Sequence, residues 1–485
     1  MADEDTSQSV DPASSQMPAP EGEERGVGGT APNPPVKGLA APCIPAFLPR
    51  SKKPILERAL EGEALTSITS NPPKKSLLRA FTSLRHRNYR LYWSGQIISL
   101  LGSYMQSIGQ VWLVLELTHS AWQLGLVGAL QAVPVLFFSL FGGVFADRWP
   151  KRNVLLCTQL SAMIQALLLW VLIATDTIQL WHLYILALLL GLTNSLGRPT
   201  GQAFVIEMVG REDLPNAVAL NSMLSQMMRI VGPGLGGIII AASGVPILFL
   251  LNGVSFLAVI VGLLLIKSHE LHAQAPQVGS KSERKNTWQS LREGVDYVWN
   301  TPAVLLLILV VGLVLLFGSN FNVLLPLFAT DVLHIGATGF GFLSAATGVG
   351  ALLAALWLAW NNRQPTIRRV LVSTLILGAL EVLFAVSGLY LLSIVLIASV
   401  GFMETDFAAQ AMTALQTAAP DHLRGRVMSV QILFFDGSLP LGYLLMGWLS
   451  GLFGPARAML IGALLCLLIT AAGWIWHKAK GMRFP

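Results

Sequence analysis

The chain has 485 residues, of which 53% are hydrophobic and only 12% are charged. Soluble globular proteins carry about 25% charged residues, so most of this chain is not expected to face water. Its net charge of +6 does not indicate a nucleic-acid partner, because the cations lie in short segments between apolar runs and form no basic domain. These runs are continuous over about twenty residues or more, which predicts transmembrane helices.

Nothing in the sequence indicates an enzyme. The three cysteines, Cys43, Cys157 and Cys466, lie far apart and show neither a disulfide framework nor metal-ligand spacing. The eight histidines are scattered, and no phosphate-binding G-x-x-x-x-G-K-S/T motif is present. We therefore predict no catalytic residue, no metal and no cofactor.

The chain begins with a polar segment. Residues 1–75 are rich in Pro, Gly, Ser and Glu, which predicts a disordered cytoplasmic tail. Residues 76–267 then hold six apolar runs of membrane length, which predicts an N-terminal six-helix bundle. The runs are approximately 91–116, 122–146, 153–175, 180–208, 217–243 and 245–266.

A polar linker, residues 268–301, precedes a second set of apolar runs. Within it Trp288, Leu291, Val295 and Val298 recur at helical spacing, which predicts an amphipathic helix at the membrane interface. Residues 302–485 are predicted to form a C-terminal six-helix bundle, with runs at approximately 302–330, 338–360, 367–388, 390–418, 427–451 and 456–476. The predicted fold is an all-α membrane protein with twelve transmembrane helices in two six-helix bundles.

Lys and Arg are concentrated in alternate loops. They occur in loop 148–152, the linker, loop 361–369 and the C-terminal tail, whereas loops 118–121, 176–179, 331–337 and 452–455 contain none. Cytoplasmic loops are enriched in Lys and Arg, so both termini and the linker are predicted to be cytoplasmic. We expect a multi-pass protein of the cell membrane, surrounded by lipid and monomeric.

The two halves share a weak internal repeat. The segment Arg211–Val218, ahead of the fifth run, is similar to Pro420–Val427, ahead of the eleventh, 209 residues later. Pro233 and Pro440 also occupy corresponding places. Parallel halves of this kind move around a central site in alternating-access transporters, so a transporter is the function class that this repeat favours.

The segment Gly142–Arg152 joins the second and third runs and places Asp147 among three cations. Asp147 has two interpretations. It can act as a switch that closes the cytoplasmic side by pairing with a cation and with the N-terminal end of the eleventh helix, or it can be a solvated charge that helps to set topology. Arg152 can also pair with a carboxylate of the next cytoplasmic loop, such as Glu212 or Asp213.

The pattern Gly143-x-x-x-Asp147-Arg148-x-x-Lys151-Arg152 resembles the loop signature of the major facilitator superfamily, with Pro150 in place of a glycine. The resemblance implies the major facilitator fold. It also implies a gating role, which favours the switch interpretation of Asp147. The residues predicted to gate are Gly143, Asp147, Arg148 and Arg152.

Other segments narrow the resemblance. Gly232-Pro233-x-x-Gly236-Gly237 is similar to the core of the superfamily's antiporter motif, although its earlier glycines are absent, and we interpret these four residues as helix-packing and kink residues. The segments Arg87–Gln96, Trp112–Thr118 and Leu214–Asn221 resemble the exporter subgroup that includes enterobactin exporters and macrolide efflux proteins.

Polar residues within the apolar runs are candidates for a substrate cavity. On the first run, Gln96, Ser99, Ser103, Gln106 and Gln110 are spaced three and four apart. This stripe can line the cavity or can form hydrogen bonds between packed helices. The residues predicted to line the cavity are Gln106, Gln110, Asn194, Arg198 and Arg229.

Three acidic residues lie deep within predicted helices: Glu404, Asp406 and Asp436. A carboxylate shielded from water there could bind and release a proton near neutral pH, so these residues are candidates for proton coupling. The alternative is a structural pair with Arg198 or Arg229.

The leading functional hypothesis is proton-coupled export of a small amphipathic molecule, such as a drug, macrolide or siderophore. The alternative within the same class is uptake or facilitated transport of a small polar or anionic nutrient. A third hypothesis is a receptor or scaffold that no longer transports, in which the tail and linker would be the active parts.

Overall fold

A computed structural model describes residues 77–272, 287–361 and 365–481. The predicted tail, residues 1–75, lies outside the described residues. A short 3-10 helix, η1 (Leu77–Arg85), precedes the first long helix. Six long helices follow in the N-terminal half: α2 (Arg87–Thr118), α3 (Ala121–Arg148), α4 (Lys151–Ala174), α5 (Leu180–Val209), α6 (Leu214–Ser243) and α7 (Pro246–Leu264).

The linker contains η2 (Ser268–Glu270) and the helix α8 (Thr287–Asn300). The second half then has seven helices where six runs were predicted, because one run is divided in two. They are α9 (Pro302–Phe317), α10 (Phe321–Asp331), α11 (Ala337–Trp360), α12 (Ile367–Ala385), α13 (Tyr390–Ala418), α14 (Arg424–Phe453) and α15 (Pro455–Lys480).

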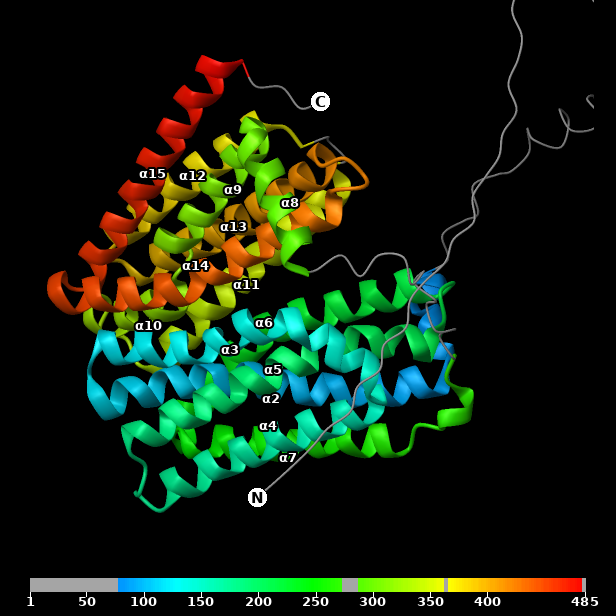
Figure 1. The fold of residues 1–485 in the computed structure, drawn as a ribbon. Coiled ribbons are helices and arrows are strands. Elements are labelled where there is room, and N and C mark those ends of the chain that lie inside the picture. The colour runs from blue at the N-terminus through cyan, green and yellow to red at the C-terminus, as the bar shows by residue number, and fades with distance from the viewer. Residues whose placement is uncertain (1–76, 273–286, 362–364, 482–485) are drawn as a thin grey trace, which may run out of the picture. The chain divides into compact units, whose positions relative to one another are not determined.

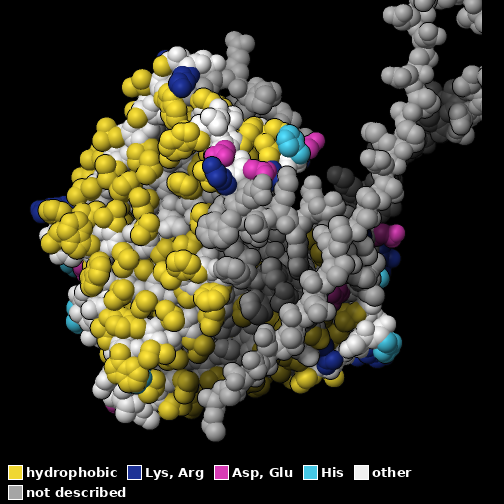
Figure 2. All heavy atoms as spheres, viewed as in Figure 1, with side chains coloured by type: hydrophobic (Ala, Val, Ile, Leu, Met, Phe, Trp, Pro, Cys, Tyr) yellow, Lys and Arg dark blue, Asp and Glu magenta, His cyan; other side chains and the backbone are white. Residues whose placement is uncertain are grey.

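Eleven segments of the described chain are long and apolar enough to cross a membrane, with α9 and α10 together counted as one. The twelfth predicted run is α12, whose 19 residues include three charges, Arg368, Arg369 and Glu381. Apolar side chains cover much of the described surface that Figure 2 shows. Many are exposed on these helices, including Leu391, Leu468 and Ile475. Such a surface is suited to lipid, and the predicted all-helical membrane fold is confirmed.

The helices pack in two groups, as the ribbon in Figure 1 shows. In the first, α2 contacts α6 and α7, while α5 contacts α3 and α4. In the second, α13 contacts α11 and α12, while α15 contacts α9 and α12. Two pairs of helices join the groups: α3 with α14, and α6 with α11. We call these two contacts the α3–α14 seam and the α6–α11 seam.

Both seams depend on glycine. At Gly125 on α3, a Cβ would meet the carbonyl oxygen of Tyr443 on α14 and would lie 3.2 Å from the Cα of Gly447. At Gly237 on α6, a Cβ would lie 2.6 Å from the carbonyl oxygen of Ala337 and 3.0 Å from the Cα of Gly341, at the start of α11. Small residues let helix backbones approach closely in membranes, so these glycines set the separation of the two groups.

The charged segment between α3 and α4 is more compact than the sequence suggested. Helix α3 continues to Arg148, and only Trp149 and Pro150 separate it from α4. Gly143, Asp147 and Arg148 therefore belong to the last turns of a helix and not to a loop. The side chains of residues 139–148 lie outside what the structure describes.

Candidate substrate and coupling site

Two charge pairs connect the two groups of helices. Arg229 on α6 interacts electrostatically with Glu404 on α13, and Arg198 on α5 interacts with Asp436 on α14. Each arginine comes from the N-terminal group and each carboxylate from the C-terminal group.

The pairs stand beside the two seams. A Cβ at Gly348 of α11 would lie 3.1 Å from the carbonyl oxygen of Arg229, so Arg229 is part of the α6–α11 seam. A Cβ at Gly437, the residue after Asp436, would lie 3.7 Å from Leu136 Cδ1 of α3. Asp436 therefore borders the α3–α14 seam. Each charge pair therefore has one member in or next to a seam.

Arg198 and Asn194 share one face of α5. Arg198 is exposed and Asn194 is partly buried. Pro199 follows Arg198 inside the helix, where it cannot donate a backbone hydrogen bond. The Arg198 guanidinium is thus accessible to a solute while it remains within electrostatic range of Asp436.

Gln106 lies inside the N-terminal group. It is only 3% exposed, its Nε2 donates to Gln165 Oε1 of α4 at 3.0 Å, and its Oε1 accepts from Asn252 Nδ2 of α7 at 2.7 Å. Gln106 thereby links three helices of one group, as the packing interpretation expects. Gln110, one turn further along, is 6% exposed.

Asp406 lies inside the C-terminal group and is 6% exposed. Its carboxylate accepts hydrogen bonds from Ser373 Oγ on α12, at 2.8 Å, and from the amide of Gln410. Gln410 also donates to Ser373 at 3.1 Å. These neutral donors hold Asp406 Oδ2 within α12 and α13.

The four residues of the glycine motif on α6 face two different helices. A Cβ at Gly232 would meet Tyr104 of α2, and one at Gly236 would lie 3.4 Å from the Cα of Met105. Gly237 faces α11, and the Pro233 carbonyl oxygen lies 2.5 Å from the Cβ position of Gly341. The motif therefore lets α6 pack closely against its own group and the opposite group at once.

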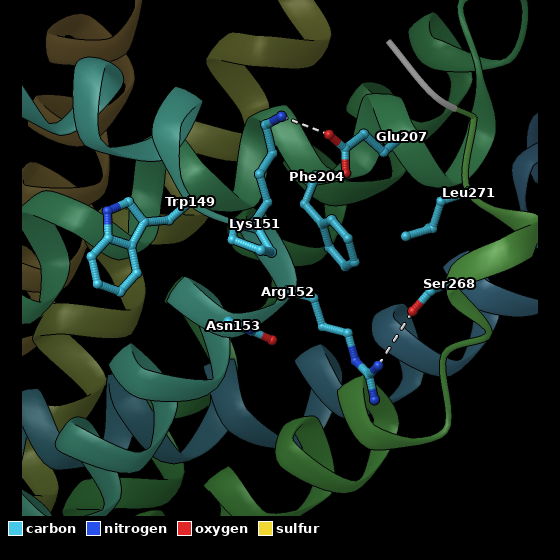
Figure 3. Close-up of a pocket in the computed structure, with 9 residues that line it drawn as sticks. Trp149, Lys151, Arg152, Asn153, Phe204, Glu207, Ser268 and Leu271 are labelled. Carbon is cyan, nitrogen blue, oxygen red and sulfur yellow. Dashed lines mark hydrogen bonds and ion pairs between the residues drawn. The ribbon is translucent and has the colours of Figure 1, made fainter.

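The cations at the start of α4 line a cavity of about 250 Å³, with Phe204, Glu207 and Leu271 among its other walls. Figure 3 shows Lys151 pointing toward Glu207 and Arg152 toward Ser268. Lys151 Nζ lies 2.6 Å from Glu207 Oε1. Sequence reasoning singled out the cations but missed Glu207 as a partner, because its position near the end of α5 resembled that of an interfacial charge.

Arg152 caps a helix. Its Nε donates to the carbonyl oxygen of Leu263 at 2.8 Å and its Nη2 to that of Leu264 at 2.9 Å, both at the C-terminal end of α7. A cation there satisfies free carbonyls and complements the helix dipole. The suggested pairing of Arg152 with Asp213 is wrong, since Asp213 pairs with His86 at 2.8 Å.

Two groups of membrane-length helices, joined by glycine seams and bridged by charge pairs, define a membrane transporter of the major facilitator type. Residues 78–481 match the family described as "Transmembrane secretion effector", and the chain belongs to that family. The fold and the family are those of transporters and not of enzymes, as the sequence predicted.

Curated relatives match this chain over nearly their whole length. The staphyloferrin A transporter of Staphylococcus aureus is 25% identical over 383 residues, which cover 79% of this chain and 94% of the relative. The enterobactin exporter EntS of Shigella boydii is 27% identical over 408 residues, which cover 82% of this chain and 95% of the relative. The predicted resemblance to siderophore exporters is confirmed.

Solved structures show the same fold at low identity. An inward-facing, unoccupied bacterial homologue of the human lysosomal transporter Spinster matches with a TM-score of 0.66 and 12% identity, covering 84% of this chain and all of that one. An inward-facing bacterial homologue of the iron transporter ferroportin matches with a TM-score of 0.57 and 17% identity, covering 82% and 99%.

Proposed function

We propose that this protein exports a small amphipathic molecule by alternating access and that proton entry drives the export. The observation that carries the proposal is the placement of two arginine–carboxylate pairs across the two groups of helices, beside the seams. The names of the curated relatives favour a siderophore as the substrate, with drugs and macrolides as further candidates.

The charge pairs supply a coupling mechanism. Protonation of Glu404 or Asp436 removes the negative charge that attracts Arg229 or Arg198. Because each pair joins the two groups, its loss favours the conformation in which the groups separate on that side. An arginine released from its carboxylate is then free to hold an anionic or polar part of the substrate.

The seams support an inward-facing arrangement. The residues that form them, from Ala121 to Leu136 on α3 and from Arg229 to Gly237 on α6, belong to the halves of these helices next to loops 119–120 and 244. Those loops lack Lys and Arg and are predicted to lie outside. We place the termini and the linker in the cytoplasm, so the described arrangement is closed on the outer side.

Gly143, Asp147 and Arg148 are proposed to act when the cytoplasmic side closes. They lie in the last turns of α3, and α14 begins at Arg424, so Asp147 is proposed to latch onto the N-terminal end of α14 in the outward-facing state. Asp147→Asn is expected to slow transport without altering the pH at which coupling occurs. Unchanged transport rates in this variant would exclude the latch.

The proposed function is tested by siderophore export and drug susceptibility in cells with and without the protein, each measured with and without a protonophore. Protein-dependent export that stops when the proton gradient collapses is the expected result. Export that continues unchanged without the gradient would overturn the coupling proposal.

Uptake of a small anionic nutrient is the second candidate, and the exposed guanidinium of Arg198 is the observation that favours it. Labelled anionic metabolites supplied outside the cell separate the two. Accumulation inside protein-containing cells would favour uptake, whereas export requires accumulation outside.

A further inference from the structure

The seventh predicted transmembrane run is broken in its interior. Helix α9 ends at Phe317 and α10 begins at Phe321, so Gly318, Ser319 and Asn320 interrupt the helical hydrogen bonds. Asn320 is 0% exposed, and its Nδ2 donates to the carbonyl oxygen of Leu316 at 2.8 Å. Asn320 thus provides a hydrogen bond to a backbone carbonyl that the break leaves without a helical partner. Non-helical backbone is tolerated at membrane depth when it is buried in protein and its polar groups are bonded in this way.

A buried carboxylate lies against this break. A Cβ at Gly318 would lie 3.1 Å from each carboxylate oxygen of Glu381 on α12 and 2.9 Å from Cys466 Sγ on α15. Glu381 is only 2% exposed, and its Oε1 has no hydrogen-bond partner among the described residues. Only glycine leaves room for the carboxylate at this point.

Among the described residues, no cation is found to act on Glu381. Glu404 on α13 acts on it as a second carboxylate, Cys466 is a neutral thiol, and the break presents the carbonyl end of α9. Arg229 acts on Glu404. Tyr443 on α14 also interacts with Glu404. A buried carboxylate with no partner is costly, whereas a carboxyl group that has bound a proton is neutral and much cheaper to bury.

A polar side chain at the helix break lies next to the second carboxylate, Glu404. Ser319 is 8% exposed, and its side chain interacts with the carboxylate of Glu404. It follows Gly318, which touches Glu381, and it is a polar neighbour of Glu404. A hydroxyl group both donates and accepts, so Ser319 is suited to pass a proton between the two acids.

We propose that Glu381 is a proton-binding site and that Ser319 relays its proton to and from Glu404. The proposed ligand of the site is a proton and not a metal ion. When Glu404 gives its proton to Glu381 through Ser319, Glu404 becomes negatively charged and attracts Arg229 of the opposite group of helices. When the proton returns, that attraction is lost. This inference rests on the proposed proton-coupled transport, for which it names the buried end of the proton path.

Infrared difference spectroscopy of the purified full chain in lipid, titrated with pH, tests proton binding without any substrate. The wild type is expected to show the carbonyl band of a buried protonated carboxylic acid, and Glu381→Gln is expected to lose it. Glu116→Gln, which changes an exposed carboxylate on α2, should leave the band in place. A band that persists unchanged in Glu381→Gln would overturn the assignment.

Transport in proteoliposomes then tests the relay, with labelled enterobactin as the probe. Glu381→Gln is expected to lose movement driven by a pH gradient but to retain exchange of labelled for unlabelled probe, which also shows that the variant is folded. Ser319→Ala is expected to reduce the gradient-driven rate while retaining exchange. Full gradient-driven movement in Glu381→Gln would refute the proposal. If the wild type ignores the gradient, the proposed function fails, while the infrared result still decides whether Glu381 binds a proton.

Discussion

The interiors of the two groups of helices differ in chemistry. In the N-terminal group, the buried polar side chains at the centre of α2, α4 and α7 are neutral amides that bond to one another, with Gln106 between Gln165 and Asn252. The C-terminal group contains carboxylates instead, with the buried Glu381 at a helix break and the partly buried Glu404 facing Arg229. Neutral amides can hold helices together but do not titrate. We therefore infer that the amides of the N-terminal group stabilise helix packing and that the carboxylates of the C-terminal group bind and release protons.

The largest effect on export is expected from a substitution in the C-terminal group of helices. Glu404→Gln removes the charge that faces Arg229 and should abolish gradient-driven export, because the variant cannot alternate between charged and neutral states. Export from cells and proteoliposomes measures this. The double variant Glu404→Gln/Arg229→Gln should restore protein yield, since no unpaired arginine remains, but should not restore coupling. Proton-coupled export by either variant would contradict the role of Glu404 in proton coupling.

A smaller effect is expected at the seam that joins the two groups. Gly237→Val forces a side chain into the Ala337 carbonyl, 2.6 Å from the Cβ position, and should destabilise the described conformation by about 1–3 kcal/mol. Thermal unfolding and cysteine accessibility of α6 and α11 report this change. Gly451→Val is the matched control, because no atom lies within 4 Å of its Cβ position. Equal effects at the two sites would show that the seam does not depend on close glycine packing.

The smallest effect is expected inside the N-terminal group. Gln106→Leu deletes hydrogen bonds to α4 and α7 and should cost about 1 kcal/mol, since bonds between membrane helices contribute little each. Its thermal stability should fall slightly while the pH dependence of export stays that of the wild type. A shifted pH profile would show that the amides of the N-terminal group take part in proton coupling. It would contradict the proposed difference between the two groups of helices.

Much of the fold could be predicted because lipid imposes simple rules. Runs of membrane length defined the helices, and the short polar linker gave the division into two groups. The break at Gly318–Asn320 was missed because the apolar signal of residues 302–330 continues across it. Its only trace in the sequence is three consecutive small or polar residues, Gly-Ser-Asn, within that run.

The site was harder to predict, because periodicity places a residue on a face but does not say what the face meets. The spacing of Gln106 suited a cavity and a helix contact equally well, and its hydrogen bonds to Gln165 and Asn252 favour the contact. Sequence reasoning named Arg198 and Arg229 as alternative partners of the acidic residues, and in the structure Arg229 interacts with Glu404 and Arg198 with Asp436. Which arginine faces which carboxylate depends on packing between helices far apart in the sequence.

The most direct test of the account is the movement of protons during export, measured in proteoliposomes with an enclosed pH indicator and the siderophore that the cell assay identifies. The wild type is predicted to move protons opposite to the siderophore, and Glu404→Gln is predicted to move none. Siderophore movement by the wild type without proton movement, or equal proton movement by the variant, would contradict the claim that the charge pairs between the two groups couple protons to export.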